Sequence, residues 1–135
     1  MTLRDILDAK PHRIVSINHK LTVADAINAM NEKNVSGILI VDDNNKLVSI
    51  FTERDIVHCV VDNISFDETL NNVIRHDIIK FDPFVKIRSV IPVALKKGIR
   101  HIPVLEGDTI VGMVTFRDLV SNLLPEICYL ARQIY

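Results

Sequence analysis

The sequence predicts an α+β fold of α/β type, built from two tandem βαββα repeats. Three observations predict it. The second half of the chain repeats the first, apolar residues alternate between strand-length runs and helical spacing, and the composition (48% hydrophobic, 24% charged) is typical of a folded domain. A chain of 135 residues buries roughly two-thirds of its unfolded surface, which is enough for a core.

Self-similarity along the chain is the strongest of these observations. Residues 35–41 (VSGILIV) match residues 99–105 (IRHIPVL) at an offset of 64. Residues 48–56 (VSIFTERDI) match 111–119 (VGMVTFRDL) at an offset of 63, and the lead-in 2–7 (TLRDIL) resembles 69–74 (TLNNVI). Self-similarity at a fixed period indicates a repeated structural unit.

The repeat sets the expected boundaries, which are residues 1–66 and 67–124 for the two repeats and 125–135 for a C-terminal helical tail. In the tail, Ile127, Leu130, Ala131 and Ile134 fall on one helical stripe. That stripe either covers the chain's own core or forms part of a dimer surface.

Each repeat is predicted to run helix, strand, helix, strand, strand, helix. A short strand is expected over residues 13–17. Thr22 then suits a helix N-cap, with Asp25 three residues on as its capping-box partner. Helical spacing predicts that this helix faces the core with Val23, Ala26, Ile27 and Met30.

The second half of each repeat is predicted to be a hairpin and a closing helix. Strands 38–41 and 47–51 flank the turn-rich residues 42–45, and the second copy shortens this turn to residues 106–108. One face of the first closing helix is predicted from Ile56, Val57, Val60 and Val61.

Pro92 falls inside the second repeat's helix, where Asn28 stands in the first. Proline removes a backbone donor and clashes with the preceding turn, so a kink or a late helix start is expected. The distortion is either tolerated locally or bends the helix toward a ligand.

Charge and cysteine content exclude several classes of protein. The net charge of −1 and the low aromatic content (5%) argue against nucleic-acid and anionic-membrane partners. Cys59 and Cys128 form no disulfide framework and are more often buried than reactive. With no apolar signal-peptide stretch and no apolar run of spanning length, a cytoplasmic protein is expected.

No catalytic or metal motif stands out. The five histidines lack metal-ligand spacing, and no arrangement typical of nucleophilic catalysis can be argued. We therefore expect no metal, no catalytic cofactor and no enzymatic activity.

The two conserved-looking blocks of each repeat, 37–42 with 47–55 and 100–105 with 110–118, resemble tandem CBS (cystathionine-β-synthase) domains, a Bateman module, over residues 2–124. The resemblance implies two repeats packed around a pseudo-twofold axis with clefts that bind an adenosine-containing ligand: AMP, ADP, ATP, S-adenosylmethionine or NAD(H). It also implies a stand-alone regulatory module that signals allosterically to a partner protein and forms a disc-like homodimer. The alternative is a ligand-free structural or dimerisation module.

The Thr-x-x-Asp pairs Thr52/Asp55 and Thr115/Asp118 are the motif on which ligand binding depends. Each follows an apolar strand and opens a helix, where free backbone N–H groups can hold a phosphate. By the resemblance, the aspartate accepts from ribose hydroxyls. The alternative for each pair is a capping box that needs no ligand.

The copies differ in ways that favour a site built mainly from the second. Gly112 lets a backbone approach a ligand where the first copy has Ser49, and Pro103 stands where the first has Leu39. Arg100 and His101 either contact phosphate or face solvent at a strand edge. Residues 1–67 carry a net charge of −3 and residues 68–135 carry +2.

The nucleotide-binding residues predicted in the second copy are Thr115, Asp118, Arg117, Gly112, Arg100, His101, Ile102, Pro103, Ile79 and Lys80. Those predicted in the first are Thr52, Asp55, Arg54 and Ile38.

Overall fold

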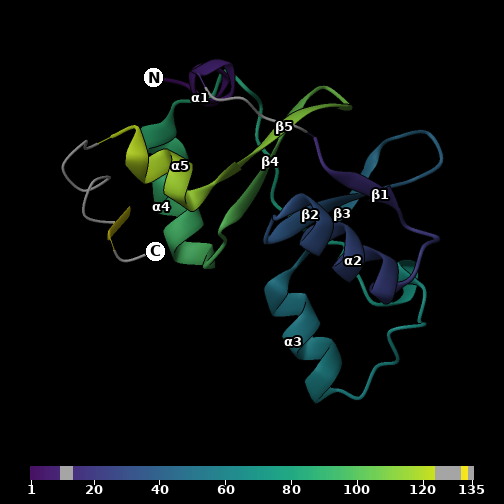
Figure 1. The fold of residues 1–135 in the computed structure, drawn as a ribbon. Coiled ribbons are helices and arrows are strands. Elements are labelled where there is room, and N and C mark those ends of the chain that lie inside the picture. The colour runs from purple at the N-terminus through teal and green to yellow at the C-terminus, as the bar shows by residue number, and fades with distance from the viewer. Residues whose placement is uncertain (10–13, 124–131, 134–135) are drawn as a thin grey trace. The chain divides into compact units, whose positions relative to one another are not determined.

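A computed structural model describes residues 1–9, 14–123 and 132–133 (Figure 1). Its contacts divide the chain into two compact units. Unit 1 is formed from Met1–Arg13 and Ile79–Tyr135, and unit 2 from Ile14–Ile78. Each unit has its own hydrophobic core. The C-terminal stripe predicted from Ile127, Leu130, Ala131 and Ile134, as well as Cys128, lies outside the described residues.

Unit 2 contains a three-stranded sheet in the order β1-β2-β3. The strand β1 (Ser16–Asn18) runs parallel to β2 (Gly37–Val41), which pairs antiparallel with β3 (Leu47–Thr52). The helices are α2 (Val23–Lys33) and α3 (Glu53–Val61), followed by the short 3₁₀ helix η1 (Leu70–Asn72). The predicted strands, hairpin and helices of the first repeat are therefore confirmed.

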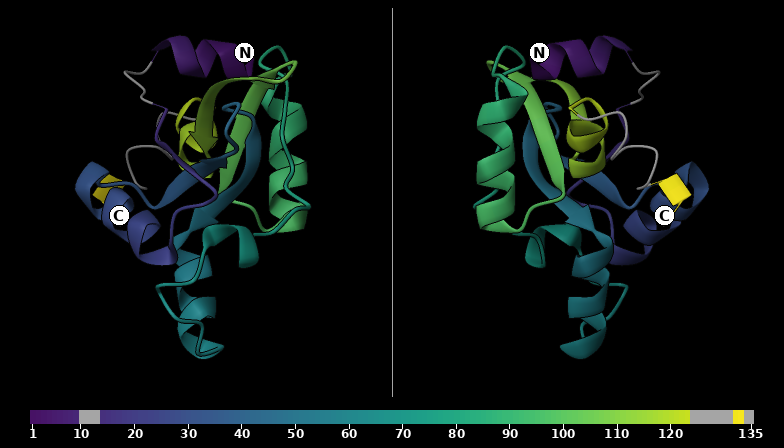
Figure 2. Two further views of the ribbon diagram at one scale, coloured as in Figure 1. Left: turned by 90° about the vertical axis from the view of Figure 1, so that its right-hand side faces the viewer. Right: turned by 90° about the vertical axis from the view of Figure 1, so that its left-hand side faces the viewer.

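Unit 1 contains the antiparallel hairpin of β4 (His101–Glu106) and β5 (Thr109–Thr115). The helices are α1 (Leu3–Ala9), α4 (Ile87–Lys97) and α5 (Phe116–Ser121). Figures 1 and 2 show α1 beside β5. The sequence predicted a third strand here, but Phe81 makes only an isolated parallel bridge to Val104.

Proline explains why this strand is so short. In unit 2, the backbone N–H of His19 donates to the carbonyl of Val41 at 2.9 Å just beyond β1. The equivalent position in the second repeat, 64 residues on, is Pro83, which has no N–H. The bridge at Phe81 therefore cannot extend in the same way.

The two hairpins have the same register. Gly37 lies opposite Thr52 in unit 2, as His101 lies opposite Thr115 in unit 1. Both hairpins have a register shift at the same place, 64 residues apart. The repeat found in the sequence is therefore a structural repeat.

The lead-in of each repeat packs in the unit of the other repeat. The N–H of Leu3 donates to the carbonyl of Val85 at 3.1 Å in unit 1, and the N–H of Leu70 donates to the carbonyl of Leu21 at 2.8 Å in unit 2. Leu3 is buried in the unit 1 core and Leu70 in the unit 2 core. Each unit is consequently completed by a segment of the other repeat.

The second lead-in forms only a 3₁₀ turn, although a helix was predicted there. Asn71 and Asn72 stand where the first lead-in has Arg4 and Asp5. Asparagine competes with the helix backbone for hydrogen bonds and has a lower helix propensity than arginine. The residue composition thus accounts for the difference.

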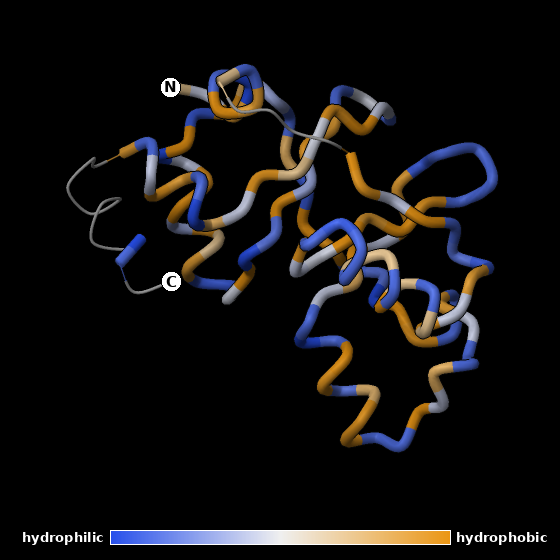
Figure 3. Tube along the Cα trace, viewed as in Figure 1, coloured by the Kyte–Doolittle hydropathy of each residue, from blue (hydrophilic) through white to orange (hydrophobic). Residues whose placement is uncertain are grey.

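Two expectations about helices were wrong. Val57, Val60 and Val61 do not face the core, because α3 turns Cys59 inward and leaves these valines exposed. Figure 3 shows strongly hydrophobic positions along α3 as well as along the strands. The helix with Pro92 does not start late either, since α4 begins at Ile87, the position equivalent to Val23 of α2.

The predicted core face of α2 is confirmed for Val23, Ala26 and Met30, while Ile27 is half-buried. The buried Cys59 agrees with the expectation that it is a core residue. Burial raises the pKa of its thiol, with a smaller contribution from the charge of Asp55.

Candidate functional site

The predicted residues of the second copy gather where β4 begins and α5 starts. His101 lies opposite Thr115 in the hairpin. The N–H of Phe116 donates to the carbonyl of Arg100 at 2.9 Å, which brings the residue before β4 to the first turn of α5. Arg100 and Arg117 are exposed, and His101 is half-buried. The antiparallel pairing therefore joins two stretches that the sequence separates by about one hairpin.

The threonine–aspartate pair at this point forms a capping box. The N–H of Thr115 donates to Asp118 Oδ2 at 2.9 Å, and the N–H of Asp118 donates to Thr115 Oγ1 at 3.2 Å. Equivalent pairs cap other helices: Thr2/Asp5, Thr22/Asp25 and Thr52/Asp55. Hydrogen bonds from Thr2 lower the pKa of Asp5. The capping-box alternative is thus confirmed for both predicted site pairs, and their contact with a ligand stays a prediction.

An open pocket of about 390 Å³ lies between α1 and α5 in unit 1. Its residues combine an apolar edge with cations, a carboxylate and an amide: Ile6, Ala9, Arg117, Asp118, Ser121, Asn122 and Arg132. The side-chain amide of Asn122 donates to the carbonyl of Asp118 at 2.7 Å. Two predicted site residues, Arg117 and Asp118, therefore line the same hollow.

The sequence analysis missed the other residues of this pocket. Ser121 and Asn122 stand one helical turn after Arg117 and Asp118, so helical spacing could have identified them. Arg132 lies in the C-terminal tail, where only apolar residues had been considered. Ile6 and Ala9 belong to the first lead-in, and no local signal predicts that it joins the second repeat.

The predicted strand residues lie deeper. Ile102 belongs to the hydrophobic core of unit 1, and Pro103 and Gly112 are buried. Ile79 is half-buried and Lys80 exposed just before Phe81, whose N–H donates to the carbonyl of Pro103 at 3.1 Å. That hydrogen bond places residues 79–80 beside β4.

In the first copy the equivalent aspartate has a second partner. Asp55 Oδ2 accepts from the N–H of Thr52 at 2.8 Å and from Thr52 Oγ1 at 3.1 Å, while Asp55 Oδ1 lies 3.6 Å from Arg75 Nε. Arg54 is exposed, and Ile38 is buried in the core of unit 2. The carboxylate of Asp55 therefore serves both the helix cap and an ion pair.

Ser49 marks the other difference between the copies. It is fully buried at the position equivalent to Gly112, and its hydroxyl donates to the carbonyl of Ile50 at 3.4 Å. A buried hydroxyl with one long hydrogen bond fills space that glycine leaves open.

Charge separates the two units more sharply than it separates the two halves of the sequence. Unit 2 has 5 Lys and Arg against 10 Asp and Glu, a net charge of −5. Unit 1 has 11 against 7, a net charge of +4. A small anion is therefore attracted more strongly to unit 1, which also holds the pocket.

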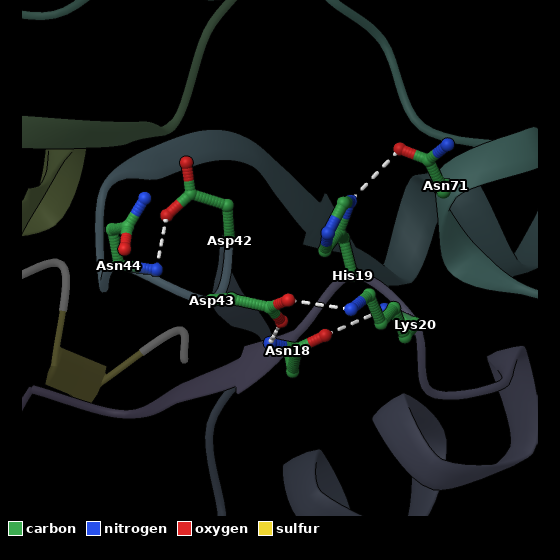
Figure 4. A network of polar contacts seen from close by, with 7 residues as sticks. All are labelled: Asn18, His19, Lys20, Asp42, Asp43, Asn44 and Asn71. Atoms are coloured by element: carbon green, nitrogen blue, oxygen red, sulfur yellow. Dashed lines mark hydrogen bonds and ion pairs between the residues drawn. The ribbon is translucent and has the colours of Figure 1, made fainter.

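A polar network in unit 2 lies apart from all predicted site residues (Figure 4). Asp43 accepts from Asn18 Nδ2 at 2.9 Å and forms an ion pair with Lys20, and these contacts lower the pKa of Asp43. His19 Nδ1 lies 3.0 Å from Asn71 Oδ1. The network ties the end of β1 to the β2–β3 turn and to η1.

Two searches of the described residues gave negative results. Within residues 1–9, 14–123 and 132–133, no three His, Cys, Asp or Glu side chains gather as a metal site would need. Among the same residues, none of the helices has the length and apolarity to cross a membrane.

Comparison with known proteins defines the class to which this fold and repeat belong. The family model described as CBS domain matches residues 3–62 and again residues 70–125. The chain therefore belongs to the CBS domain family and contains two tandem CBS repeats, a pair known as a regulatory module in nucleotide-sensing proteins.

Solved structures agree with this fold. A putative signal-transduction protein with CBS domains from Burkholderia ambifaria is 27% identical, with a TM-score of 0.86 over 93% of this chain and 96% of that one. A CBS-domain-containing protein from Agrobacterium tumefaciens gives a TM-score of 0.85 at 19% identity, over 91% and 93% of the two chains.

Sequence relatives are longer proteins. An uncharacterized protein of Methanocaldococcus jannaschii is 29% identical over 90% of this chain, which spans 42% of that protein. An inosine-5'-monophosphate dehydrogenase of Nitrosopumilus maritimus is 30% identical over 79% of this chain, which spans 22% of the enzyme.

Proposed function

We propose that this protein is a regulatory module that binds an adenosine nucleotide (AMP, ADP or ATP) or S-adenosylmethionine and passes the binding signal allosterically to a partner protein. It acts as a cytoplasmic homodimer and is not an enzyme. Its functional repeats are residues 1–66 and 67–124, followed by the tail 125–135. The ligand is the only small molecule required, with no catalytic cofactor or metal and no nucleic-acid or membrane partner.

The pocket in the positively charged unit is the observation that carries this proposal. Arg117 and Arg132 supply cations for phosphate oxygens, and guanidinium groups suit phosphate through paired N–H donors. Asp118 lines the same pocket and offers carboxylate oxygens to ribose hydroxyls. One pocket thus combines complementary groups for both halves of a nucleotide.

The remaining second-copy residues extend this site. Arg100 and His101 lie at the start of α5 and can reach further phosphates, while Gly112, Ile102, Pro103, Ile79 and Lys80 form the surrounding backbone and strand edge. The first-copy site, with Thr52, Asp55, Arg54 and Ile38, is the weaker one, because Arg75 already pairs with Asp55 and Ser49 replaces glycine.

Allosteric output requires that the nucleotide bind two states of the module with different affinities. Coupling of this kind amounts to about 1–3 kcal/mol in typical cases. Segments similar to this chain make up about a fifth of inosine-5'-monophosphate dehydrogenases, 22% and 21% of two of them. Such proportions agree with an accessory regulatory role rather than a catalytic one.

A thermal-shift panel of AMP, ADP, ATP, S-adenosylmethionine and NADH tests the proposal. Ligand at about 100 times its dissociation constant adds roughly 2.7 kcal/mol of stability, which is a shift of several degrees. We expect at least one ligand to shift the wild type and to lose its effect on Asp118→Ala. If no adenosine ligand shifts the wild type, nucleotide sensing is wrong.

A matched control separates binding from capping. Asp25→Ala removes the equivalent capping box of α2, outside the proposed site. Both variants should lose on the order of 1 kcal/mol of stability, but Asp25→Ala should keep the full ligand shift. An unchanged shift in Asp118→Ala would remove the site assignment and leave the sensor proposal standing.

A ligand-free interaction module is the second candidate, favoured by the exposed valines of α3 and by Leu39 and Ser49 in the first copy. It predicts self-association or partner binding that is unaffected by every ligand of the panel.

A further inference from the structure

Three valines on α3 leave an apolar surface on unit 2. Val57, Val60 and Val61, which we call the valine face, are 59%, 60% and 70% exposed. Their spacing places them together on the side of the helix away from the buried Cys59. Single exposed apolar residues are ordinary, but a contiguous group on one helix face indicates a contact surface.

A second apolar surface lies on unit 1 and is basic. Phe84 and Leu95 are 62% and 64% exposed, and they lie with the exposed cations Arg88 and Lys96 on and just before α4. We call these four residues the basic face. The helix itself, IRSVIPVALKK, contains no acidic residue.

The net charges of the two units decide which surfaces can meet. In an association of two copies, pairing like units would bring −5 against −5 and +4 against +4. Pairing unlike units brings −5 against +4, which is attractive at short range even in physiological salt. Since the valine face carries both Glu53 and Arg54 nearby, the preference comes from unit 2 as a whole.

We infer that the valine face of one copy packs on the basic face of a second copy, so that the dimer joins unlike units. This inference rests on the homodimer of the proposed function and adds to it the surfaces and the pairing. Apolar contacts between Val57, Val61 and Leu95 supply the buried area, and Arg88 and Lys96 meet the acidic surface of unit 2.

Charge variants of the full chain test the pairing by sedimentation equilibrium. Arg88→Glu/Lys96→Glu should weaken self-association roughly tenfold, and Val57→Lys/Val61→Lys should do the same. Combining all four substitutions in one chain should restore association, because the lysines of one copy then meet the glutamates of the other. Association of the wild type should also weaken as NaCl rises from about 0.05 M to about 0.5 M.

Pairing of like units predicts the opposite result. The combined variant would place lysines against lysines and glutamates against glutamates, so it would associate least of all. That result, a monomeric wild type, or unchanged association of Arg88→Glu/Lys96→Glu would each overturn the inference. Lys33→Glu/Lys46→Glu changes the net charge equally on exposed residues of unit 2 and should not weaken association.

The thermal-shift panel, repeated on the charge variants, separates this inference from nucleotide sensing. All substituted residues lie outside the proposed nucleotide site. A retained ligand shift without the predicted rescue overturns the pairing alone, and rescue without any ligand shift overturns nucleotide sensing alone. Far-ultraviolet circular dichroism of each variant establishes that it is folded before its association is compared.

Discussion

The two units have equivalent hairpins and capping boxes, but they differ around the aspartate that follows the second hairpin strand. Asp55 is ion-paired with Arg75 in a unit of net charge −5, whereas Asp118 lines a pocket with two arginines in a unit of net charge +4. One structural frame therefore carries two different chemical environments. The comparison teaches that the frame determines where the carboxylate lies, while residues outside the motif determine what it can bind.

The exchanged lead-ins give the largest expected effect. Leu7 is buried in the core of unit 1 and Leu70 in that of unit 2. Each substitution to alanine should cost about 2–5 kcal/mol. Hydrogen exchange should show Leu7→Ala loosening residues 81–119 and Leu70→Ala loosening residues 15–64, although Leu7 belongs to the first repeat. Loosening of residues 15–64 by Leu7→Ala would contradict the exchange.

Nucleotide titration compares the two aspartates directly. Asp118→Ala should weaken binding at least tenfold, about 1.4 kcal/mol, because a carboxylate that accepts from ribose is lost. Asp55→Ala removes the equivalent capping box and should change the affinity by less than about twofold. Isothermal titration calorimetry measures both, with one nucleotide per wild-type chain expected. Equal losses in the two variants would show that both copies contribute.

The helix ends of α2 and α4 offer a smaller comparison at equivalent positions. Asn34 ends α2 with φ of 54°, and Gly98 ends α4 with φ of 64°. A Cβ at Gly98 would meet nothing within 4 Å, so Gly98→Ala should cost about 1 kcal/mol from backbone strain alone. Asn34→Gly should change the free energy of unfolding by only a few tenths of a kcal/mol. Urea unfolding tests both, and a neutral Gly98→Ala would exclude strain at this position.

The network around Asp43 gives the smallest effect, and it has no equivalent in unit 1. Contacts from Lys20 and then Asn18 lower the pKa of Asp43 below its ordinary 3.8. A lowered pKa means that the carboxylate stabilises the fold above that ordinary value and loses this contribution as pH falls through its folded pKa. Lys20→Gln should raise the pKa of Asp43, as measured by NMR titration, and should leave that of Asp5 unchanged. An unmoved Asp43 would assign the shift to another group.

Local features were predictable from the sequence because they depend on residues close together in the chain. The repeat, the capping boxes at Thr22 and Thr115 and the turn of residues 42–45 all follow from short-range patterns. The face of α3 was not predictable. Apolar residues lie on both sides of this helix, and the hairpin and the cap at Thr52 determine which side turns inward.

The sequence alone determined that the chain is two CBS repeats, with an acidic first half and a basic second half. Only the tertiary structure decided that each lead-in completes the other repeat's unit, that Arg75 pairs with Asp55, and that Ser121, Asn122 and Arg132 join Asp118. The physical reason is that these contacts join segments far apart in the chain or depend on the orientation of packed helices. No local propensity specifies such contacts, since they form only when apolar faces are buried together.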